Sequence, residues 1–95
     1  MGLKEGNKLY VRVDKASGKK VTNKDAEEHM DYVKKIAEER FFVGGMFGNV
    51  NGGMILMEAK DLKEARTIFT TDPLIENGLY NCDIFSWKLM VLSEQ

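Results

Sequence analysis

The stretch FFVGGMFGNVNGGMILMEA, residues 41–59, decides how this chain folds, because it has the pattern of a β-hairpin. Its two ends are rich in aromatic and aliphatic residues, as β-strands are. Between them, Asn51-Gly52 is a strong short-range turn signal, so we expect a turn over residues 49–53. The glycines at 44 and 45 suggest either a bulge or a close approach of the backbone to a neighbour or a ligand.

A strand and a helix precede this hairpin. Residues 9–14 alternate and are rich in β-formers, which predicts a strand. Apolar residues then recur at helical spacing, which predicts a helix that begins at a cap on Thr22 or Asn23 and ends near Arg40. The inward stripe of that helix is expected to consist of Ala26, His29, Met30, Val33, Ile36 and Ala37.

A second helix and a last strand follow the hairpin. The run from Asp61 to Glu64 resembles a capping box that starts the helix. Pro73 disfavours helical geometry at Asp72 and is expected to end it there. Residues 74–78 can add one further turn, and residues 80–92 predict a long final strand.

The resulting order, βαββαβ, indicates an α+β protein of the ferredoxin-like pattern, with two helices on one face of a four-stranded antiparallel sheet. An open α+β meander is an alternative arrangement of the same elements. With 95 residues, we expect a single domain over 1–95.

The predicted strands are apolar on both faces, although two helices can cover only one face. In the last strand, for example, Ile84 lies on one side, and Phe85 and Trp87 lie on the other. A second copy packed sheet to sheet would cover the helix-free face, so we expect a homodimer. The alternative is that some of these residues lie at strand ends or bulges. Which face of the sheet Trp87 occupies stays open at this point.

Composition excludes several classes of function. A net charge of −1 gives no basic footprint for nucleic acid, and no apolar run approaches a membrane span. Residues 1–6 have no apolar signal-peptide core, so we expect a cytoplasmic protein. One cysteine, Cys82, and one histidine give no disulfide and no transition-metal site, and we expect no metal and no cofactor.

Two residues stand out chemically, His29 and Asp72. The topology places the start of the first helix and the end of the second at the same end of the domain. A histidine and a carboxylate that share a site can perform acid–base catalysis or hold a small polar ligand. The alternative is a buried, satisfied histidine beside an Asp-Pro turn. The residues expected to contact a ligand at this end are Gly44, Gly45, Phe47 and Tyr80.

The chain resembles the YCII-related (YciI-like) family over most of its length. The resemblance rests on the segments HMDYV (29–33), FVGGMF (42–47), GGMILMEA (52–59), LKEAR (62–66), TDPL (71–74), NGLY (77–80) and FSW (85–87). It implies a dimeric α+β barrel with a His-Asp active site at His29 and Asp72. One member is a dehydrochlorinase acting on a chlorinated hydroxyhydroquinone, which implies elimination or isomerisation chemistry.

The sequence departs from the family pattern at two places. Many members carry a basic residue shortly before the histidine, where this chain has Ala26, Glu27 and Glu28, so the resemblance does not support an anionic substrate. Many also have a glycine between the first helix and the second strand, where this chain has Glu39 and Arg40.

The resulting hypothesis is a small cofactor-free enzyme, lyase-like or isomerase-like, that acts on a small polar or aromatic metabolite. A non-catalytic dimeric domain that binds a small ligand or regulates a partner is the alternative. A structural protein without a ligand is the third interpretation.

Overall fold

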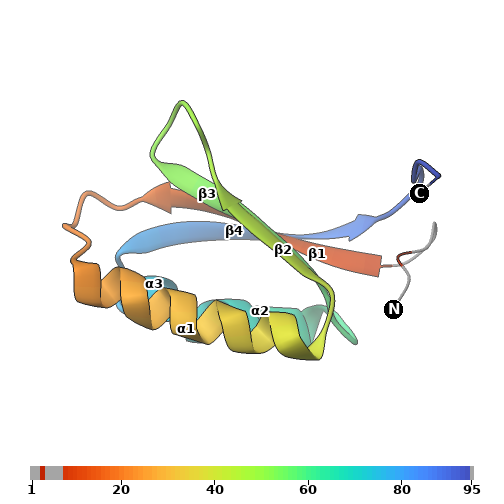
Figure 1. Cartoon of the computed structure of the whole chain (residues 1–95), viewed down its shortest axis with the longest axis horizontal. Helices are drawn as coiled ribbons and strands as arrows, with labels where there is room; N and C mark the ends of the chain where they lie inside the picture. The colour runs from red at the N-terminus through yellow and green to blue at the C-terminus, as the bar shows by residue number, and fades with distance from the viewer. Residues whose placement is uncertain (1–2, 4–7, 95) are drawn as a thin grey trace.

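The computed structural model describes Leu3 and residues 8–94, and its elements follow the predicted βαββαβ order (Figure 1). The elements are β1 (Lys8–Ala16), α1 (Asn23–Glu39), β2 (Phe42–Met46), β3 (Gly52–Glu58), α2 (Leu62–Thr71), α3 (Pro73–Glu76) and β4 (Tyr80–Lys88). The short α3 is the predicted further turn before the last strand. Most of the amino-terminal stretch, for which the sequence predicts no signal peptide, lies outside the described residues.

The four strands form one antiparallel sheet in the order β2-β3-β1-β4, which confirms the ferredoxin-like pattern. β1 lies between β3 and β4 and pairs with both along nearly its whole length. Alternate residues of β1 therefore point toward the helices or toward the opposite face, with a neighbouring strand on each side.

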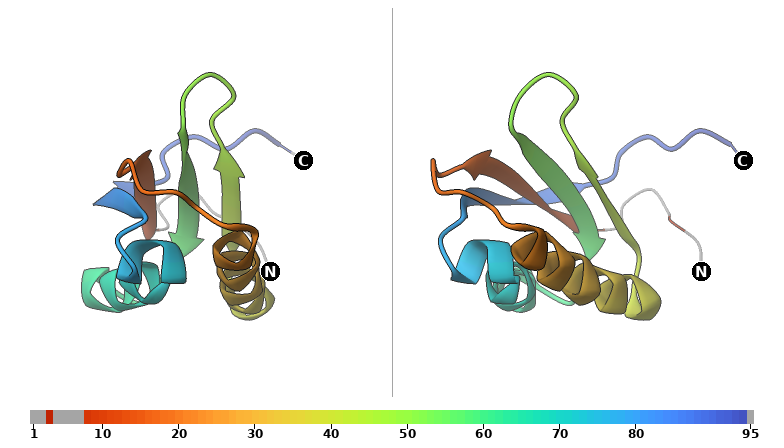
Figure 2. Two further views of the ribbon diagram at one scale, coloured as in Figure 1. Left: turned by 90° about the vertical axis from the view of Figure 1, so that its left-hand side faces the viewer. Right: turned by 60° about the vertical axis from the view of Figure 1, so that its left-hand side comes forward.

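All helices lie on one face of the sheet (Figure 2). α1 runs beneath the β2–β3 side, whereas α2 and α3 lie beneath β1 and β4. The buried apolar core lies between these two layers. It consists of Tyr10, Val33, Ile36, Ile55, Met57, Ala65 and Phe69.

α1 begins where the sequence predicts. The side chain of Thr22 accepts a hydrogen bond from the Asp25 N–H at 3.1 Å, and the Asp25 carboxylate accepts one from the Thr22 N–H at 2.9 Å. This reciprocal capping box satisfies two backbone donors that a helix start otherwise leaves without partners. It fixes the first turn of α1, one turn before His29.

The inward stripe of α1 is narrower than the sequence predicts. Val33 and Ile36 are buried, but Ala26, Met30 and Ala37 are exposed. α1 faces the β2 side of the sheet, where Gly44 offers no side chain to pack against. The predicted stripe therefore borders open space there instead of a filled core.

α2 and α3 are separated at Asp72, as the proline predicts. Asp61 caps α2 by accepting a hydrogen bond from the Glu64 N–H at 2.8 Å. The Glu64 carboxylate accepts from the Lys60 N–H at 2.9 Å instead of from Asp61, so the capping box is only half formed. Pro73 occupies the first turn of α3, where its missing N–H costs no helical hydrogen bond.

The hairpin differs from the sequence prediction in its turn. Gly52 and Gly53 belong to β3, so the turn is displaced toward the amino terminus. The pairing of β2 with β3 is one to one, from Phe42↔Met57 to Met46↔Gly53, so the predicted alternative of a bulge is wrong over these pairs.

The last strand is shorter than predicted, because it ends at Lys88 and not at Leu92. Its partner β1 begins at Lys8, which pairs with Lys88. Residues 89–92 follow that pair, and their apolar pattern does not continue the strand.

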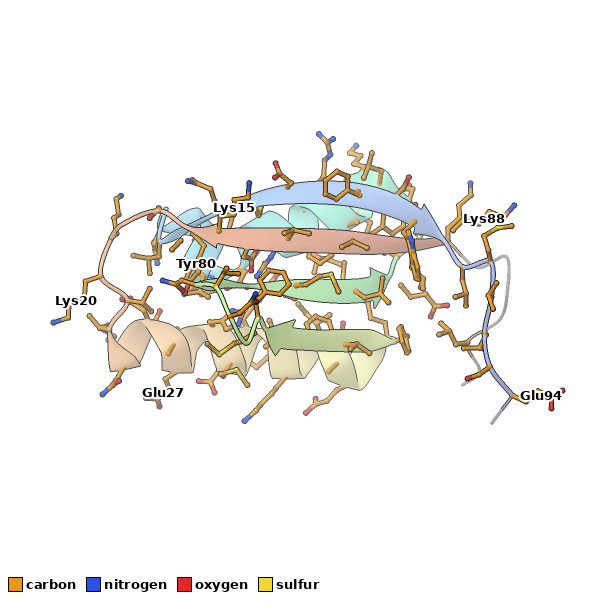
Figure 3. All side chains as sticks on the ribbon, turned by 90° about the horizontal axis from the view of Figure 1, so that it is seen from above. Lys15, Lys20, Glu27, Tyr80, Lys88 and Glu94 are labelled. Atoms are coloured by element: carbon orange, nitrogen blue, oxygen red, sulfur yellow. The ribbon has the colours of Figure 1, made fainter. Side chains whose placement is uncertain are left out.

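The helix-free face of the sheet, which Figure 3 shows from above, carries exposed apolar side chains. Trp87 shares this face with Phe85, because both pair with β1 residues that alternate with the buried Tyr10 and Arg12. Val43, Phe85 and Trp87 remain 54%, 54% and 47% exposed. The labelled Lys15 and Lys88 lie toward opposite ends of the sheet in this view.

Among the residues that the structure describes, no helix is long and apolar enough to cross a membrane.

Candidate active site

The structure brings His29 and Asp72 into direct contact. Nδ1 of His29 lies 2.7 Å from Oδ2 and 2.9 Å from Oδ1 of Asp72. Asp72 is fully buried, whereas the His29 side chain is 20% exposed. The carboxylate is thus enclosed, and the imidazole lies between it and open space.

Asp72 is held in place by the backbone of its own turn. It lies between α2 and α3, and its Oδ1 accepts a hydrogen bond from the Leu74 N–H at 3.0 Å. The Pro73 ring favours this geometry, because it restricts the residue before it to extended conformations. The Asp-Pro turn and the contact with His29 are therefore two roles of one side chain.

Two further charged residues, Arg12 and Asp14, complete the cluster. Nη1 of Arg12 lies 2.9 Å from Oδ2 of Asp72 and donates to the Phe69 carbonyl, also at 2.9 Å. Nε and Nη2 of Arg12 bind the two carboxylate oxygens of Asp14 at 2.8 and 2.9 Å. Arg12 is 1% exposed, so one buried guanidinium is shared by two carboxylates.

Arg12 and Asp14 were not among the predicted site residues, although the sequence carries a signal for them. Along β1, Leu9, Val11 and Val13 alternate with Tyr10, Arg12 and Asp14. One face of the strand is therefore aliphatic, and the other carries two opposite charges two positions apart. On a strand face that packs against helices, such a pair signals a buried ionic cluster.

The cluster shifts the pKa values of its two carboxyl groups in opposite directions. At Asp72, burial acts to raise the pKa, but the hydrogen bond from His29, the Arg12 charge and the Leu74 N–H together hold it below its usual value. At Asp14, burial is the largest effect and raises the pKa despite the bond to Arg12. As the pH falls, Asp72 is therefore the one of the two that stays ionised longer.

The ionised state of Asp72 sets the tautomer of His29. A carboxylate can only accept hydrogen bonds, so Nδ1 of His29 must donate the proton in this contact. In the neutral imidazole, Nε2 then carries the lone pair. Nε2 is the ring nitrogen turned away from Asp72, and His29 lines a cavity.

That cavity has a volume of about 520 Å³ and lies between α1 and the β2–β3 hairpin. His29 provides an imidazole and Asp14 a carboxyl group along its wall, Tyr80 provides a hydroxyl, and Lys34 provides an ammonium group. The remaining wall is mainly apolar. It includes Val21, Met30, Val33, Phe42, Met46, Met54, Ile55 and Leu74.

Three of the four predicted ligand contacts line this cavity, namely Gly44, Gly45 and Tyr80. The Tyr80 hydroxyl donates a hydrogen bond to Oδ1 of Asn51 at 2.9 Å, which ties β4 to the hairpin turn. Phe47 does not line the cavity, so its prediction as a ligand contact is not supported. Its ring instead lies beside Gly52, where β3 begins.

The glycine pairs permit close approach of strands. A Cβ at Gly53 would lie 2.6 Å from the Gly45 carbonyl oxygen, and a Cβ at Gly52 would collide with the Asp14 carbonyl oxygen. Gly44 faces the helix side, where a Cβ would lie 3.2 Å from the Phe42 ring and 3.3 Å from Ile55. The missing side chain at Gly44 therefore widens the cavity.

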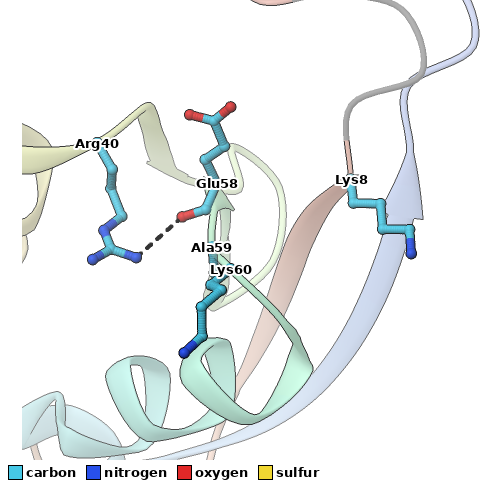
Figure 4. Close-up of a pocket in the computed structure, with 5 residues that line it drawn as sticks. All are labelled: Lys8, Arg40, Glu58, Ala59 and Lys60. Carbon is cyan, nitrogen blue, oxygen red and sulfur yellow. Dashed lines mark hydrogen bonds between the residues drawn. The ribbon is translucent and has the colours of Figure 1, made fainter.

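A second, more open hollow of about 370 Å³ lies away from this cluster (Figure 4). It is lined by Lys8, Arg40, Glu58, Ala59 and Lys60. Arg40 donates to the Glu58 carbonyl at 3.4 Å and to the Glu64 carboxylate at 2.8 Å. Neither His29 nor Asp72 lines this second hollow.

Cys82 lies on β4 and is partly buried. Burial raises the pKa of its thiol, which makes it a poor nucleophile at neutral pH. Among the described residues, no group of three or more His, Cys, Asp or Glu side chains is placed to hold a metal ion.

Comparison with known proteins yields a family and a fold. The family model described as "YCII-related domain" matches residues 8–88. The "Uncharacterized protein YjpA" of Bacillus subtilis (strain 168) is 36% identical over 62 residues, which cover 64% of this chain and 73% of that protein.

The fold is similar to that of 5-chloro-2-hydroxyhydroquinone dehydrochlorinase (TftG) from Burkholderia phenoliruptrix AC1100, solved in complex with 2,5-dihydroxybenzoquinone. The TM-score is 0.67, and the match covers 84% of this chain and 93% of that one. At 16% identity, this likeness shows a shared fold.

Proposed function

Because this chain belongs to the YCII-related domain family, we propose that it is a small acid–base enzyme that needs no cofactor for proton transfer. The reaction class is lyase-like or isomerase-like, and the substrate is a small polar or aromatic metabolite. The observation that carries this proposal is the contact of 2.7 Å between Nδ1 of His29 and Oδ2 of Asp72 at the wall of a cavity.

In this proposal, Nε2 of His29 is the base that removes a proton from the bound substrate. Asp72 fixes the ring by accepting the Nδ1 proton and stabilises the imidazolium that forms. His29 then returns the proton elsewhere on the same molecule, or protonates a leaving group. The first outcome is isomerisation, and the second is elimination.

The solved structure with the similar fold supports the chemistry by analogy. That protein is named a dehydrochlorinase and was solved with a dihydroxybenzoquinone. Loss of hydrogen chloride begins with removal of a proton, which is a task for a base such as Nε2. We therefore carry the reaction type, but not the substrate, to this chain as part of the proposal.

We also propose that the protein works as a homodimer. Val43, Phe85 and Trp87 are exposed on the helix-free face of the sheet. Exposed apolar patches of this kind on a folded protein mark an interaction surface. A second copy offers the same patch, so packing sheet to sheet would remove both from water.

The test of the enzyme proposal begins with a metabolite library and a thermal shift assay. Wild type should gain stability from some compound, because a ligand that binds the folded state raises the melting temperature. Each hit is then assayed for turnover with wild type, His29→Ala, Asp72→Asn and Asp31→Asn, an exposed control on the same helix.

His29→Ala and Asp72→Asn should each lower turnover by about 10²- to 10⁴-fold. The double variant should be little slower than the less active of the two single variants, because the two residues act as one unit. Asp31→Asn should leave turnover unchanged. Equal turnover in all four proteins would mean that the pair is structural. Binding without turnover in wild type would favour a non-catalytic ligand-binding or regulatory domain.

A further inference from the structure

The cavity is longer than a single six-membered ring requires. Its wall includes α1 residues from Ala26 to Ala37, which are about 16 Å apart along the helix axis at about 1.5 Å per residue. His29 lies near the first of these positions. Val33, Ala37 and Phe42 form the wall farther along, and all three are apolar.

The charges beside His29 do not balance. Asp14 and Asp72 each contribute a negative charge, and Arg12 contributes one positive charge that both share. With both carboxyl groups ionised and a neutral imidazole, the buried cluster carries one net negative charge. The ammonium group of Lys34 lies on an exposed helix position at the rim of the cavity, where water screens it.

The placement of Lys34 on α1 keeps its charge apart from His29. At about 100° per residue, His29 and Lys34 lie on opposite borders of the helix stripe that faces the cavity, with Met30 and Val33 between them. A ligand group at Nε2 of His29 therefore lies beside the negative cluster and away from the lysine.

From this charge and this length, we propose that the site takes an uncharged, elongated and largely apolar molecule whose one weakly acidic group, a phenol, an enol or a C–H beside a carbonyl, lies at His29. This inference rests on the proposed acid–base function of the same site and names its substrate class. An anionic reacting group is disfavoured there by the net negative cluster.

Proton transfer to His29 then removes the net charge of the cluster. The X–H bond of the neutral substrate breaks, its electron pair stays on X, and the proton forms a new N–H bond at Nε2. The substrate becomes an anion, and the cluster with its imidazolium becomes neutral overall. The cluster thus favours the state that follows proton removal over a state with an anion already bound to neutral His29.

The test measures the binding of three probes at pH about 7 by calorimetry and by amide chemical shifts of α1. The probes are para-phenylphenol, para-phenylbenzoate and phenol. The phenols are uncharged at this pH, because their pKa is near the value of about 10 for tyrosine, whereas the benzoate is ionised. Para-phenylphenol should bind about tenfold more tightly than either of the other two.

Paired variants locate the binding and identify the charge effect. Ala37→Leu, which fills the apolar end, should weaken para-phenylphenol by about tenfold, whereas Lys35→Leu, on the exposed opposite side of α1, should not. Asp14→Asn should bring the affinities of para-phenylbenzoate and para-phenylphenol closer together. Lys34 is exposed, so Lys34→Gln remains informative if Asp14→Asn does not fold. It should leave the affinities of para-phenylbenzoate and para-phenylphenol unchanged.

A tighter complex with para-phenylbenzoate that Lys34→Gln abolishes would overturn the proposal and make the ligand an anion bound by the lysine. Equal binding of phenol and para-phenylphenol would overturn the elongated shape. These affinities do not depend on turnover. The expected pattern without any His29-dependent turnover would therefore refute the enzyme and leave the ligand class standing.

Discussion

A single arginine, Arg12, joins the two acidic residues of the candidate site. Its guanidinium binds both oxygens of Asp14 and approaches Oδ2 of Asp72 to 2.9 Å. It also donates to the Phe69 carbonyl and lies 5.7 Å from the centre of the Phe69 ring. At the scale of single residues, Arg12 thus connects β1 to the carboxyl end of α2 and orients the partner of His29.

Removal of Arg12 should destabilise the fold strongly. Arg12→Ala leaves two carboxylates without their shared cation in a buried site, so we expect a loss of about 3–5 kcal/mol in the free energy of unfolding. Arg12→Lys keeps the charge but loses the two-pronged contact with Asp14, so it should lose less. Urea denaturation of both variants measures the difference. Equal losses would show that the geometry of the guanidinium does not matter.

The pH dependence of stability should report Asp72. Its pKa is lower in the folded state than the unfolded value of about 3.9, so the unfolded state binds more protons in that range. Its contribution to stability is therefore complete above about pH 4 and is lost as the pH falls through the folded pKa. Wild type and Asp72→Asn should differ most at neutral pH and converge in acid. Parallel stability curves down to pH about 2 would contradict this assignment.

At the scale of elements, the start of α1 determines where His29 lies. Thr22 and Asp25 cap the helix reciprocally, and His29 follows one turn after Asp25. Tyr32 donates a hydrogen bond from its hydroxyl to the Ile68 carbonyl at 2.7 Å, which ties α1 to α2. The cap and this tie hold the histidine opposite Asp72.

Loss of the cap should lower stability moderately. Thr22→Ala removes the side-chain acceptor for the Asp25 N–H, so we expect a loss of about 1 kcal/mol. Thr67→Ala is the matched control, because the Thr67 hydroxyl only bonds back to the Lys63 carbonyl on an exposed turn of α2. Alanine is the better helix former there, so the control should be neutral or slightly stabilising. Thermal melts of both variants give the comparison, and equal losses would argue against the cap.

At the scale of the whole molecule, the two faces of the sheet differ in cover. The helices cover one face, and Val43, Phe85 and Trp87 remain exposed on the other. β2 and β4 are the two edge strands, so Val43 lies at one side of this face, and Phe85 and Trp87 lie at the other. These exposed apolar side chains are the surface on which the proposed homodimer depends.

Sedimentation should show a dimer at micromolar concentration. Phe85→Lys and Trp87→Lys each place a charge on the helix-free face and should shift the protein toward monomer, with a dissociation constant raised by at least about tenfold. Lys63→Glu, on the exposed side of α2, is the control and should leave the dimer unchanged. A monomeric wild type would refute the homodimer.

The sequence predicted the order of the elements and the meeting of His29 with Asp72, because periodicity and the Pro73 break determine both. It could not show how Arg12 and Asp14 combine with that pair, since their contacts cross from β1 to α2. It also overestimated the packing of α1. A hydrophobic pattern shows which residues share a helix face, but it does not show whether each of them is packed. Ala37 and Gly44 line the same cavity, and Gly44 has no side chain that could fill the space between them.

The position of Asp72 between two helices has a consequence for how lineages of this fold diverge. Its side chain caps α3 through the Leu74 N–H and lies beside Arg12, so selection for a folded chain retains it even where no reaction is selected. His29, on a partly exposed helix face, contacts only this carboxylate among the side-chain bonds described above, and Arg12 and the Leu74 N–H also hold it. Among descendants, an aspartate kept at this position reports the fold, and a histidine kept at the other reports the chemistry.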